Sequence, residues 1–206
     1  MDEQSKQRYH DIFTQADKRS RGFLYPQELK MLLETNGYSF HEEGLENLVE
    51  HICGEHKKVS FHKFLSMMNF LIEMHQLFLE LDENGDENLS KAEFAHAIKK
   101  MKFELQKEQL DLMFQITDTN RNGLASFEEF VSTLLYLYNI KRVFESADTE
   151  GNGTLDTTEF YKFLPILKIK ASKHDAQQAL SQFDLDNDGE LNFPEFVHFI
   201  FTIRDI

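Results

Sequence analysis

One pattern of apolar residues recurs six times along this chain, each time around a short polar segment. In the clearest copy, apolar side chains stand eight, five, four and one positions before Asp184, and one, four and five positions after Glu195. Spacings of three and four residues place these side chains on one face of a helix. Each copy therefore predicts a helix, a polar loop and a second helix, and the whole chain is expected to be all-α.

The amino-acid composition agrees with this repeat. The chain has 206 residues, 41% of them hydrophobic, which is enough to bury a sizeable core. It contains 20 phenylalanines and no tryptophan, and phenylalanine recurs four residues before the loops and directly after them. We interpret these apolar stripes as helix packing surfaces.

The polar segments are called loops 1 to 6 below. They run from Asp17 to Glu28, Cys53 to Lys63, Asp82 to Glu93, Asp118 to Glu129, Asp148 to Glu159 and Asp184 to Glu195. Loop 6 reads DLDNDGELNFPE. Carboxylates this close repel one another by ~1 kcal/mol per close pair even in water, which indicates that a cation is bound among them.

Calcium explains the spacing of the oxygen-bearing residues. It takes six to eight oxygens, which a twelve-residue loop supplies from positions 1, 3 and 5, the carbonyl of position 7, position 9 through water, and a bidentate Glu at position 12. Position 6 needs a left-handed backbone, which glycine adopts most easily. Loop 6 meets every one of these requirements.

The pattern D-x-[DN]-x-[DN]-G-x5-E between two helices is the EF-hand motif, and the chain resembles the EF-hand family over essentially its whole length. The resemblance implies four calcium sites, with the carbonyls of Asn88, Leu124, Thr154 and Glu190 at position 7. The expected metal ligands are Asp82, Asn84, Asp86, Asn88 and Glu93 in loop 3; Asp118, Asn120, Asn122, Leu124 and Glu129 in loop 4; Asp148, Glu150, Asn152, Thr154 and Glu159 in loop 5; and Asp184, Asp186, Asp188, Glu190 and Glu195 in loop 6.

The four loops are not expected to bind equally well. Loop 5 has the longer Glu150 at position 3, and loop 4 has only two charged ligands, which predicts weaker binding. Loop 3 carries Glu87 at position 6, with its glycine displaced to Gly85. A left-handed non-glycine residue costs ~1 to 2 kcal/mol, so loop 3 is expected to bind more weakly.

Loops 1 and 2 are predicted to hold no calcium. Arg19 and Arg21 stand at positions 3 and 5 of loop 1, where oxygen ligands belong, and loop 2 ends on Lys63 at the clamp position. Cys53 with His51, His56 and His62 offers an alternative zinc or redox site, but the spacing matches no strong zinc signature. A solvated or packed cluster is the preferred interpretation.

EF-hands pack in pairs, and their loops meet through a short two-strand contact at position 8. The expected partners are Leu24 with Val59, Leu89 with Ala125, and Leu155 with Leu191. This pairing predicts three lobes, at residues 1–72, 73–138 and 139–206, of which only the second and third bind metal.

The connectors between loops predict how the helices run. Residues 64–81 and 130–147 contain neither Gly nor Pro, so each is expected to be one helix shared by successive loops. The other connectors carry helix stops and capping signals, at Asn36-Gly37 with Ser39 and Glu42, at Pro165 with Ser172 and Asp175, and between Lys102 and Gln106.

Shared helices resemble the penta-EF-hand family, whereas six loops in one chain resemble calbindin, calretinin and secretagogin. The fifth loop has a partner within the chain here, so the dimerisation of the penta-EF-hand family is not implied.

The net charge and the absence of targeting signals limit the expected partners and location. The net charge of −14 argues against nucleic acid and anionic membranes and favours cations and basic peptides. The single Cys53 excludes an intramolecular disulfide, the N-terminus lacks the apolar run of a signal peptide, and Asp2 stands where myristoylation needs glycine. No stretch reads as a membrane span. A cytoplasmic location is expected.

The preferred function is a calcium sensor that changes conformation and engages a protein or basic peptide. The alternative is a buffer that binds calcium and barely opens. Methionines suit an adaptable binding surface, and the candidates for it are Met67, Met68, Met74, Met101 and Met113. Paired aspartates also hold magnesium in phosphoryl-transfer sites, but the chain has no phosphate-binding glycine loop, and no enzymatic activity is expected.

Overall fold

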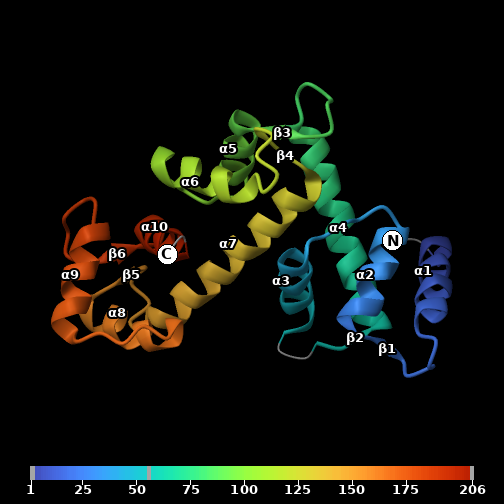
Figure 1. Cartoon of the computed structure of the whole chain (residues 1–206), viewed down its shortest axis with the longest axis horizontal. Helices are drawn as coiled ribbons and strands as arrows, with labels where there is room; N and C mark the ends of the chain where they lie inside the picture. The colour runs from blue at the N-terminus through green and yellow to red at the C-terminus, as the bar shows by residue number, and fades with distance from the viewer. Residues whose placement is uncertain (1–2, 55–56, 205–206) are drawn as a thin grey trace. The chain divides into compact units, whose positions relative to one another are not determined.

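The computed structural model describes residues 3–54 and 57–204 (Figure 1). These residues form an all-α fold, as the repeat predicts, with only two-residue strands between helices. The elements are α1 (Glu3–Ala16), β1 (Phe23–Leu24), α2 (Pro26–Thr35), α3 (Glu42–Cys53), β2 (Val59–Ser60), α4 (Phe61–Leu81), β3 (Leu89–Ser90), α5 (Lys91–Lys100), α6 (Lys107–Thr117), β4 (Leu124–Ala125), α7 (Phe127–Ala147), β5 (Thr154–Leu155), α8 (Thr157–Phe163), the 3-10 turn η1 (Leu164–Leu167), α9 (Lys173–Phe183), β6 (Leu191–Asn192) and α10 (Phe193–Arg204).

The strands pair as the sequence predicts. Antiparallel pairing joins β1 to β2, β3 to β4, and β5 to β6. Their registers place Leu24 opposite Val59, Leu89 opposite Ala125, and Leu155 opposite Leu191. All six of these residues are buried, so each strand pair also joins the apolar faces of its two loops.

The two shared helices are also confirmed. α4 and α7 are each continuous over 21 residues, or about 31 Å. α4 follows β2 of loop 2 and ends at Leu81, directly before Asp82 of loop 3. α7 leads from loop 4 to Asp148 of loop 5 in the same way. Successive loops are therefore joined by a helix with no break.

One capping prediction is wrong. Ser172 caps α9 together with Asp175, and the break between α5 and α6 falls where predicted, but Ser39 does not cap α3. α3 begins at Glu42 with His41 as its N-cap. The Ser39 backbone N–H instead donates to the Glu128 carboxylate, 3.2 Å away, because this segment packs against the start of α7.

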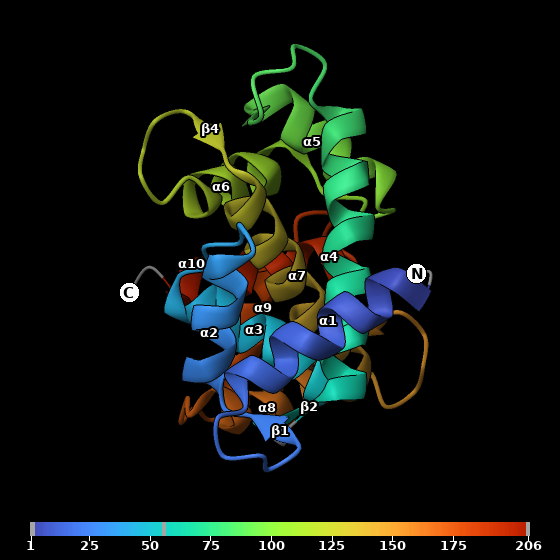
Figure 2. The same cartoon turned by 90° about the vertical axis from the view of Figure 1, so that its right-hand side faces the viewer.

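The chain divides into two compact units. One contains the chain up to Met101 together with Phe114–Tyr136, and the other contains Lys102–Met113 and the chain from Leu137 onward. The three lobes predicted from the strand pairs remain a prediction. In the first unit β1 and β2 lie at one end of α2 and α4, and α1 packs on α4 through Phe13 and Phe64, whose ring centroids are 5.6 Å apart (Figure 2).

Phenylalanine fills the core of both units. In the first, Phe94 lies between Phe114 and Phe130, at centroid distances of 5.4 and 6.3 Å. In the second, Phe160 contacts Phe199 at 4.9 Å. Three of the methionines expected at a binding surface, Met67, Met68 and Met113, are buried here as well.

Over the described residues, the chain contains no helix whose length and apolar character would let it cross a membrane.

Candidate metal centre

The five twelve-residue loops share one backbone shape. Positions 4 and 6 both have positive φ in every one of them, at Ser20 and Gly22, Gly85 and Glu87, Arg121 and Gly123, Gly151 and Gly153, and Asn187 and Gly189. Glu87 takes the left-handed conformation at position 6 that the sequence predicts, with φ of 60°. The displaced Gly85 occupies position 4, where φ is 72°, so it relieves strain at the other left-handed position of loop 3.

The position 1 aspartate organises the turn in each of these loops. One carboxylate oxygen accepts the backbone N–H of position 6, at 2.8 Å from Gly123 to Asp118, 2.8 Å from Gly153 to Asp148, and 2.9 Å from Gly189 to Asp184. In loop 3 the N–H of Glu87 lies 2.8 Å from Asp82. These bonds fold the loop around its first carboxylate.

The clamp glutamate at position 12 closes each loop. In loop 6 the two Glu195 oxygens accept the backbone N–H groups of Leu185 at 2.7 Å and Asn192 at 2.9 Å. Glu93, Glu129 and Glu159 accept from positions 2 and 9 of their own loops in the same way. Glu129, Glu159 and Glu195 are buried. The clamp is thus held in place by the loop's own backbone.

Side-chain oxygens at positions 3 and 5 complete the arrangement. In loops 3, 4 and 6 each accepts a backbone N–H two residues ahead, as Asn84 does from Asp86 at 2.9 Å and Asn122 from Leu124 at 2.8 Å. In loop 5 the position 5 residue Asn152 does so, from Thr154 at 3.0 Å. In loop 6 each of Asp184, Asp186 and Asp188 offers an oxygen, and these atoms lie within 4.8 Å of one another. Hard oxygen donors in such a ring fit calcium or magnesium.

Two clamp carboxylates have lowered pKa values. The Ser90 hydroxyl and several backbone N–H groups lower the pKa of Glu93. Burial raises the pKa of Glu129, but hydrogen bonds from Thr119 and Ser126 outweigh it, and the net shift is downward. Both glutamates are therefore ionised at neutral pH, as a cation ligand must be.

A side-chain contact between loops 5 and 6 was not foreseen. The Thr154 hydroxyl donates to the Glu190 carboxylate, and both residues stand at position 7. The sequence interpretation gave each only a backbone carbonyl to contribute. The signal was present, because the predicted Leu155–Leu191 register makes Thr154 and Glu190 diagonal neighbours on one face of the strand pair.

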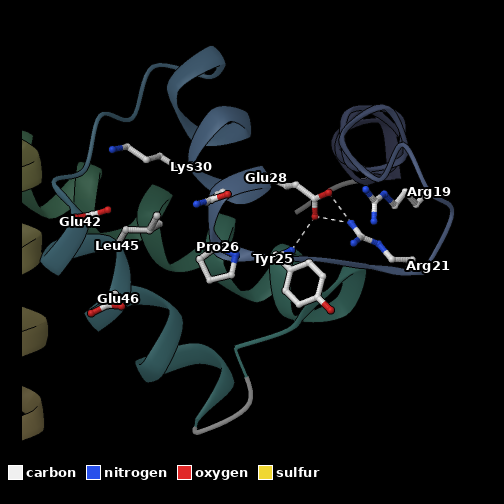
Figure 3. Close-up of a pocket in the computed structure, with 10 residues that line it drawn as sticks. Arg19, Arg21, Tyr25, Pro26, Glu28, Lys30, Glu42, Leu45 and Glu46 are labelled. Carbon is white, nitrogen blue, oxygen red and sulfur yellow. Dashed lines mark hydrogen bonds and ion pairs between the residues drawn. The ribbon is translucent and has the colours of Figure 1, made fainter.

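Loop 1 is arranged differently (Figure 3). The Arg21 guanidinium points at the clamp carboxylate, with one nitrogen 2.5 and 2.6 Å from the two oxygens of Glu28. Its Nε lies 3.6 Å from Asp17 Oδ1. Arg19 is exposed and lies with Arg21 beside a pocket of about 730 Å³, which both basic and acidic side chains line.

Loop 2 also contains a basic side chain. The Lys63 ammonium, at the clamp position, donates to the Cys53 carbonyl at 2.9 Å. Of the alternative zinc cluster, His56 lies outside the described residues, and the rest of the cluster is not brought together: Cys53 is buried, while His51 and His62 are exposed. Burial raises the pKa of the Cys53 thiol, which makes it a poorer metal ligand.

A known protein family matches the part of the chain that contains loops 3 to 6. The model of the EF-hand domain pair matches residues 72–134 and 137–201. The "Probable calcium-binding protein CML11" of Oryza sativa subsp. japonica is 29% identical over 134 residues, covering 60% of this chain and 64% of the rice protein, so the match spans slightly less than two thirds of that relative. The "Probable calcium-binding protein CML27" of Arabidopsis thaliana is 30% identical over 128 residues, covering 60% and 75%.

Among solved structures, a homologue of programmed cell death 6 protein from Leishmania major Friedlin matches with a TM-score of 0.55 and 22% identity, over 70% of this chain and 80% of that one. This likeness concerns the fold.

Proposed function

The chain belongs to the EF-hand family, and from that premise we propose that it binds calcium at loops 3 to 6 and acts as a calcium sensor in the cytoplasm. Loops 1 and 2 hold no calcium in this proposal, which gives six hands of which four bind. No catalytic role is proposed.

One observation carries the calcium proposal. In loops 3 to 6 the carboxylates of positions 1 and 12 are already held by backbone N–H groups of their own loops. In loop 6 the oxygens of positions 1, 3 and 5 also lie within 4.8 Å of one another. The loop backbone therefore holds the carboxylates of positions 1 and 12 in place before a hard cation binds, and pre-organised donors reduce the entropic cost of binding. The names of the rice and Arabidopsis relatives, both described as calcium-binding, support the same ligand.

The proposed ligands in loops 3 to 6 are the residues at positions 1, 3, 5, 7 and 12. At position 7 the backbone carbonyl serves, so Leu124 qualifies despite its apolar side chain. Loop 6 is proposed to bind most tightly because it has the most carboxylates, and loop 4 to bind weakly because it has only Asp118 and Glu129.

Two features favour a sensor over a buffer. Four calcium ions would change the formal charge from −14 to −6, which alters how any basic partner is attracted. Met113, in the helix that leads into loop 4, is buried, so it becomes available to a partner only if calcium moves that helix. The proposed partner is a protein or basic peptide.

Calorimetric titration tests the binding proposal. The intact chain is expected to take up four calcium ions, and each of Glu93→Gln, Glu129→Gln, Glu159→Gln and Glu195→Gln is expected to remove one. The control is Glu28→Gln, which changes the equivalent residue of loop 1 and should leave the stoichiometry at four. A protein that takes up no calcium at millimolar concentration would overturn the proposal.

An environment-sensitive apolar dye separates sensor from buffer. A sensor increases the dye's fluorescence as calcium saturates the loops, because apolar side chains become accessible. Unchanged fluorescence alongside full calorimetric uptake would identify a buffer.

A further inference from the structure

Loops 1 and 2 hold no metal in the proposed function. Loop 1 nevertheless shows the same local structure as loops 3 to 6. Ser20 and Gly22 have positive φ at positions 4 and 6, and the Gly22 N–H lies 2.6 Å from Asp17 Oδ2, as in the metal-type loops. The Tyr25 N–H reaches the Glu28 clamp at 3.0 Å, and β1 pairs with β2.

Asp17 and Glu28 are both negatively charged and lie at the two ends of loop 1, so a nearby positive charge is needed to reduce their repulsion. The Arg21 side chain does this. Its guanidinium touches both oxygens of Glu28 and approaches Asp17, so one cation spans positions 1 and 12, the two residues that clamp metal in the motif.

The contact between Arg21 and Asp17 is largely shielded from solvent. Asp17 is only 6% exposed and the Arg21 side chain only 20%. Within the described residues, neither Arg21 Nε nor Asp17 Oδ1 has a hydrogen-bond partner, so their ion pair is what offsets the burial of these two atoms. The Arg21 guanidinium also lies 4.9 Å from the centre of the Tyr25 ring, which holds it from the outer side (Figure 3).

Arg19 provides a comparison within the same loop. It carries the same charge two residues earlier, yet its side chain is exposed and takes no part in the contact between Arg21 and Glu28 (Figure 3). A basic side chain therefore reaches the clamp carboxylate from position 5, where Arg21 stands, and not from position 3, where Arg19 stands.

Loop 2 carries a second tethered cation. The Lys63 ammonium extends from the clamp position back to the carbonyl of Cys53 at the loop's first residue, 2.9 Å away. Its nitrogen thus links the first and last residues of loop 2. The two loops that lack a calcium pattern each contain a basic side chain that bridges these ends.

We propose that Arg21 and Lys63 stand in for calcium in the first pair of hands, so that this pair keeps a cation-bound arrangement at every calcium concentration. The pair then serves as a calcium-independent part of the molecule, and only loops 3 to 6 respond to the ion. This regulatory reading rests on the proposed function, because it contrasts the first pair with loops that bind calcium.

Hydrogen exchange of the intact protein, resolved by peptide, tests the proposal. In calcium-free buffer, Arg21→Gln is expected to speed exchange over residues 13–35 by about tenfold, the effect of removing a charged hydrogen-bond partner. Arg19→Gln removes the same charge and should leave exchange there unchanged. Adding calcium to the unsubstituted protein should slow exchange in loops 3 to 6 and not in residues 13–35.

A gain-of-function variant gives a second, independent readout. Arg19→Asp combined with Arg21→Asn supplies oxygens at positions 3 and 5, and should add one calcium ion in calorimetry. Exchange over residues 13–35 should then become calcium-dependent.

Several outcomes would overturn the inference: equal exchange in Arg21→Gln and Arg19→Gln, slower exchange of residues 13–35 on adding calcium to the unsubstituted protein, or no additional ion in the double variant. If instead no segment of the unsubstituted protein responds to calcium, the proposed function fails, while the comparison of Arg21→Gln with Arg19→Gln still decides the role of Arg21.

Discussion

The hydroxyl of Thr154 donates a hydrogen bond to the carboxylate of Glu190, and the two residues hold the same position in neighbouring loops. They directly precede Leu155 and Leu191, which face each other in the strand pair. Loops 5 and 6 are therefore joined by a side-chain contact as well as by backbone pairing.

This contact predicts that the two loops bind calcium cooperatively. Thr154→Val is expected to lower the cooperativity of loops 5 and 6, because a hydrogen bond to a charged group contributes ~1.5 to 3 kcal/mol. Calcium titration in a Glu93→Gln, Glu129→Gln background isolates the two loops. Thr157→Val is the matched control, and an equal Hill slope in both variants would refute the prediction.

The calcium affinity of loop 3 should rise when Glu87 is replaced by glycine. Glu87→Gly should tighten calcium binding by loop 3 several-fold, because ~1 to 2 kcal/mol of left-handed strain is released and ~0.5 to 1 kcal/mol is lost to the greater freedom of glycine. Glu87→Gln removes the same charge but keeps the strain. The measurement is calorimetry with the other three clamps changed to Gln; equal affinity of the Gly and Gln variants contradicts the role of strain.

Gly44 lies where α3 approaches α7. A methyl group at this position would stand 2.2 Å from Ser132 Oγ and 3.1 Å from Ser132 Cβ. Gly44→Ala is expected to lower the free energy of unfolding by ~1 kcal/mol or more through overpacking. In a Ser132→Gly background the same change should stabilise by ~1 kcal/mol, since alanine favours the helix. Chemical denaturation of the four proteins measures both values, and the same sign in both backgrounds would refute the clash.

Gln109 is fully buried in α6, and both atoms of its amide group lack a hydrogen-bond partner within the described residues. Gln109→Met keeps the approximate volume and removes the unpaired polar atoms, so it should raise the free energy of unfolding by ~1 to 3 kcal/mol. Gln106→Met, at an exposed position, serves as the control. Destabilisation by Gln109→Met would mean that the amide has a partner in solution.

Acid should weaken the first pair of hands through Glu28. Hydrogen bonds from the Tyr25 N–H and from Arg21 lower the pKa of Glu28 below its ordinary value of 4.5. The stability that depends on this ionised group is complete above pH 4.5 and is lost as the pH falls through the lowered pKa. In calcium-free protein, the stability difference between the unsubstituted chain and Glu28→Gln should narrow below pH 4.5. A difference that is constant down to pH 2 would contradict this assignment.

Much of the fold follows from local rules, and the sequence therefore predicts it. The continuous α4 and α7 follow from uninterrupted apolar spacing without Gly or Pro, and the Leu24, Leu89 and Leu155 contacts follow from counting positions in a repeat. The failure at Ser39 is of another kind. A capping motif is local, but the Ser39 N–H is taken by Glu128, 89 positions away, and tertiary packing decided the start of α3.

Some residues of the candidate site could likewise be predicted from the sequence, and others could not. Positions 1 and 12 could be named because backbone geometry repeats in every loop. The role of Arg21 could not, because the sequence shows its charge but not its direction. The charged residues nearest to it in the sequence, Arg19 and Lys18, are also basic, and only the folded loop distinguishes a basic side chain that replaces the metal from one that, like Arg19, points into solvent.

The unbroken α4 has a mechanical consequence. It begins at Phe61, within loop 2, and ends at Leu81, directly before loop 3, and neither glycine nor proline provides a hinge between them. The helix must then pivot as a rigid lever about 31 Å long, so that a tilt of about 10° at Asp82 displaces its far end by about 5 Å. Lys63 sits at that far end, so the first pair of hands would be carried along with the helix as one body, with its own internal contacts unchanged.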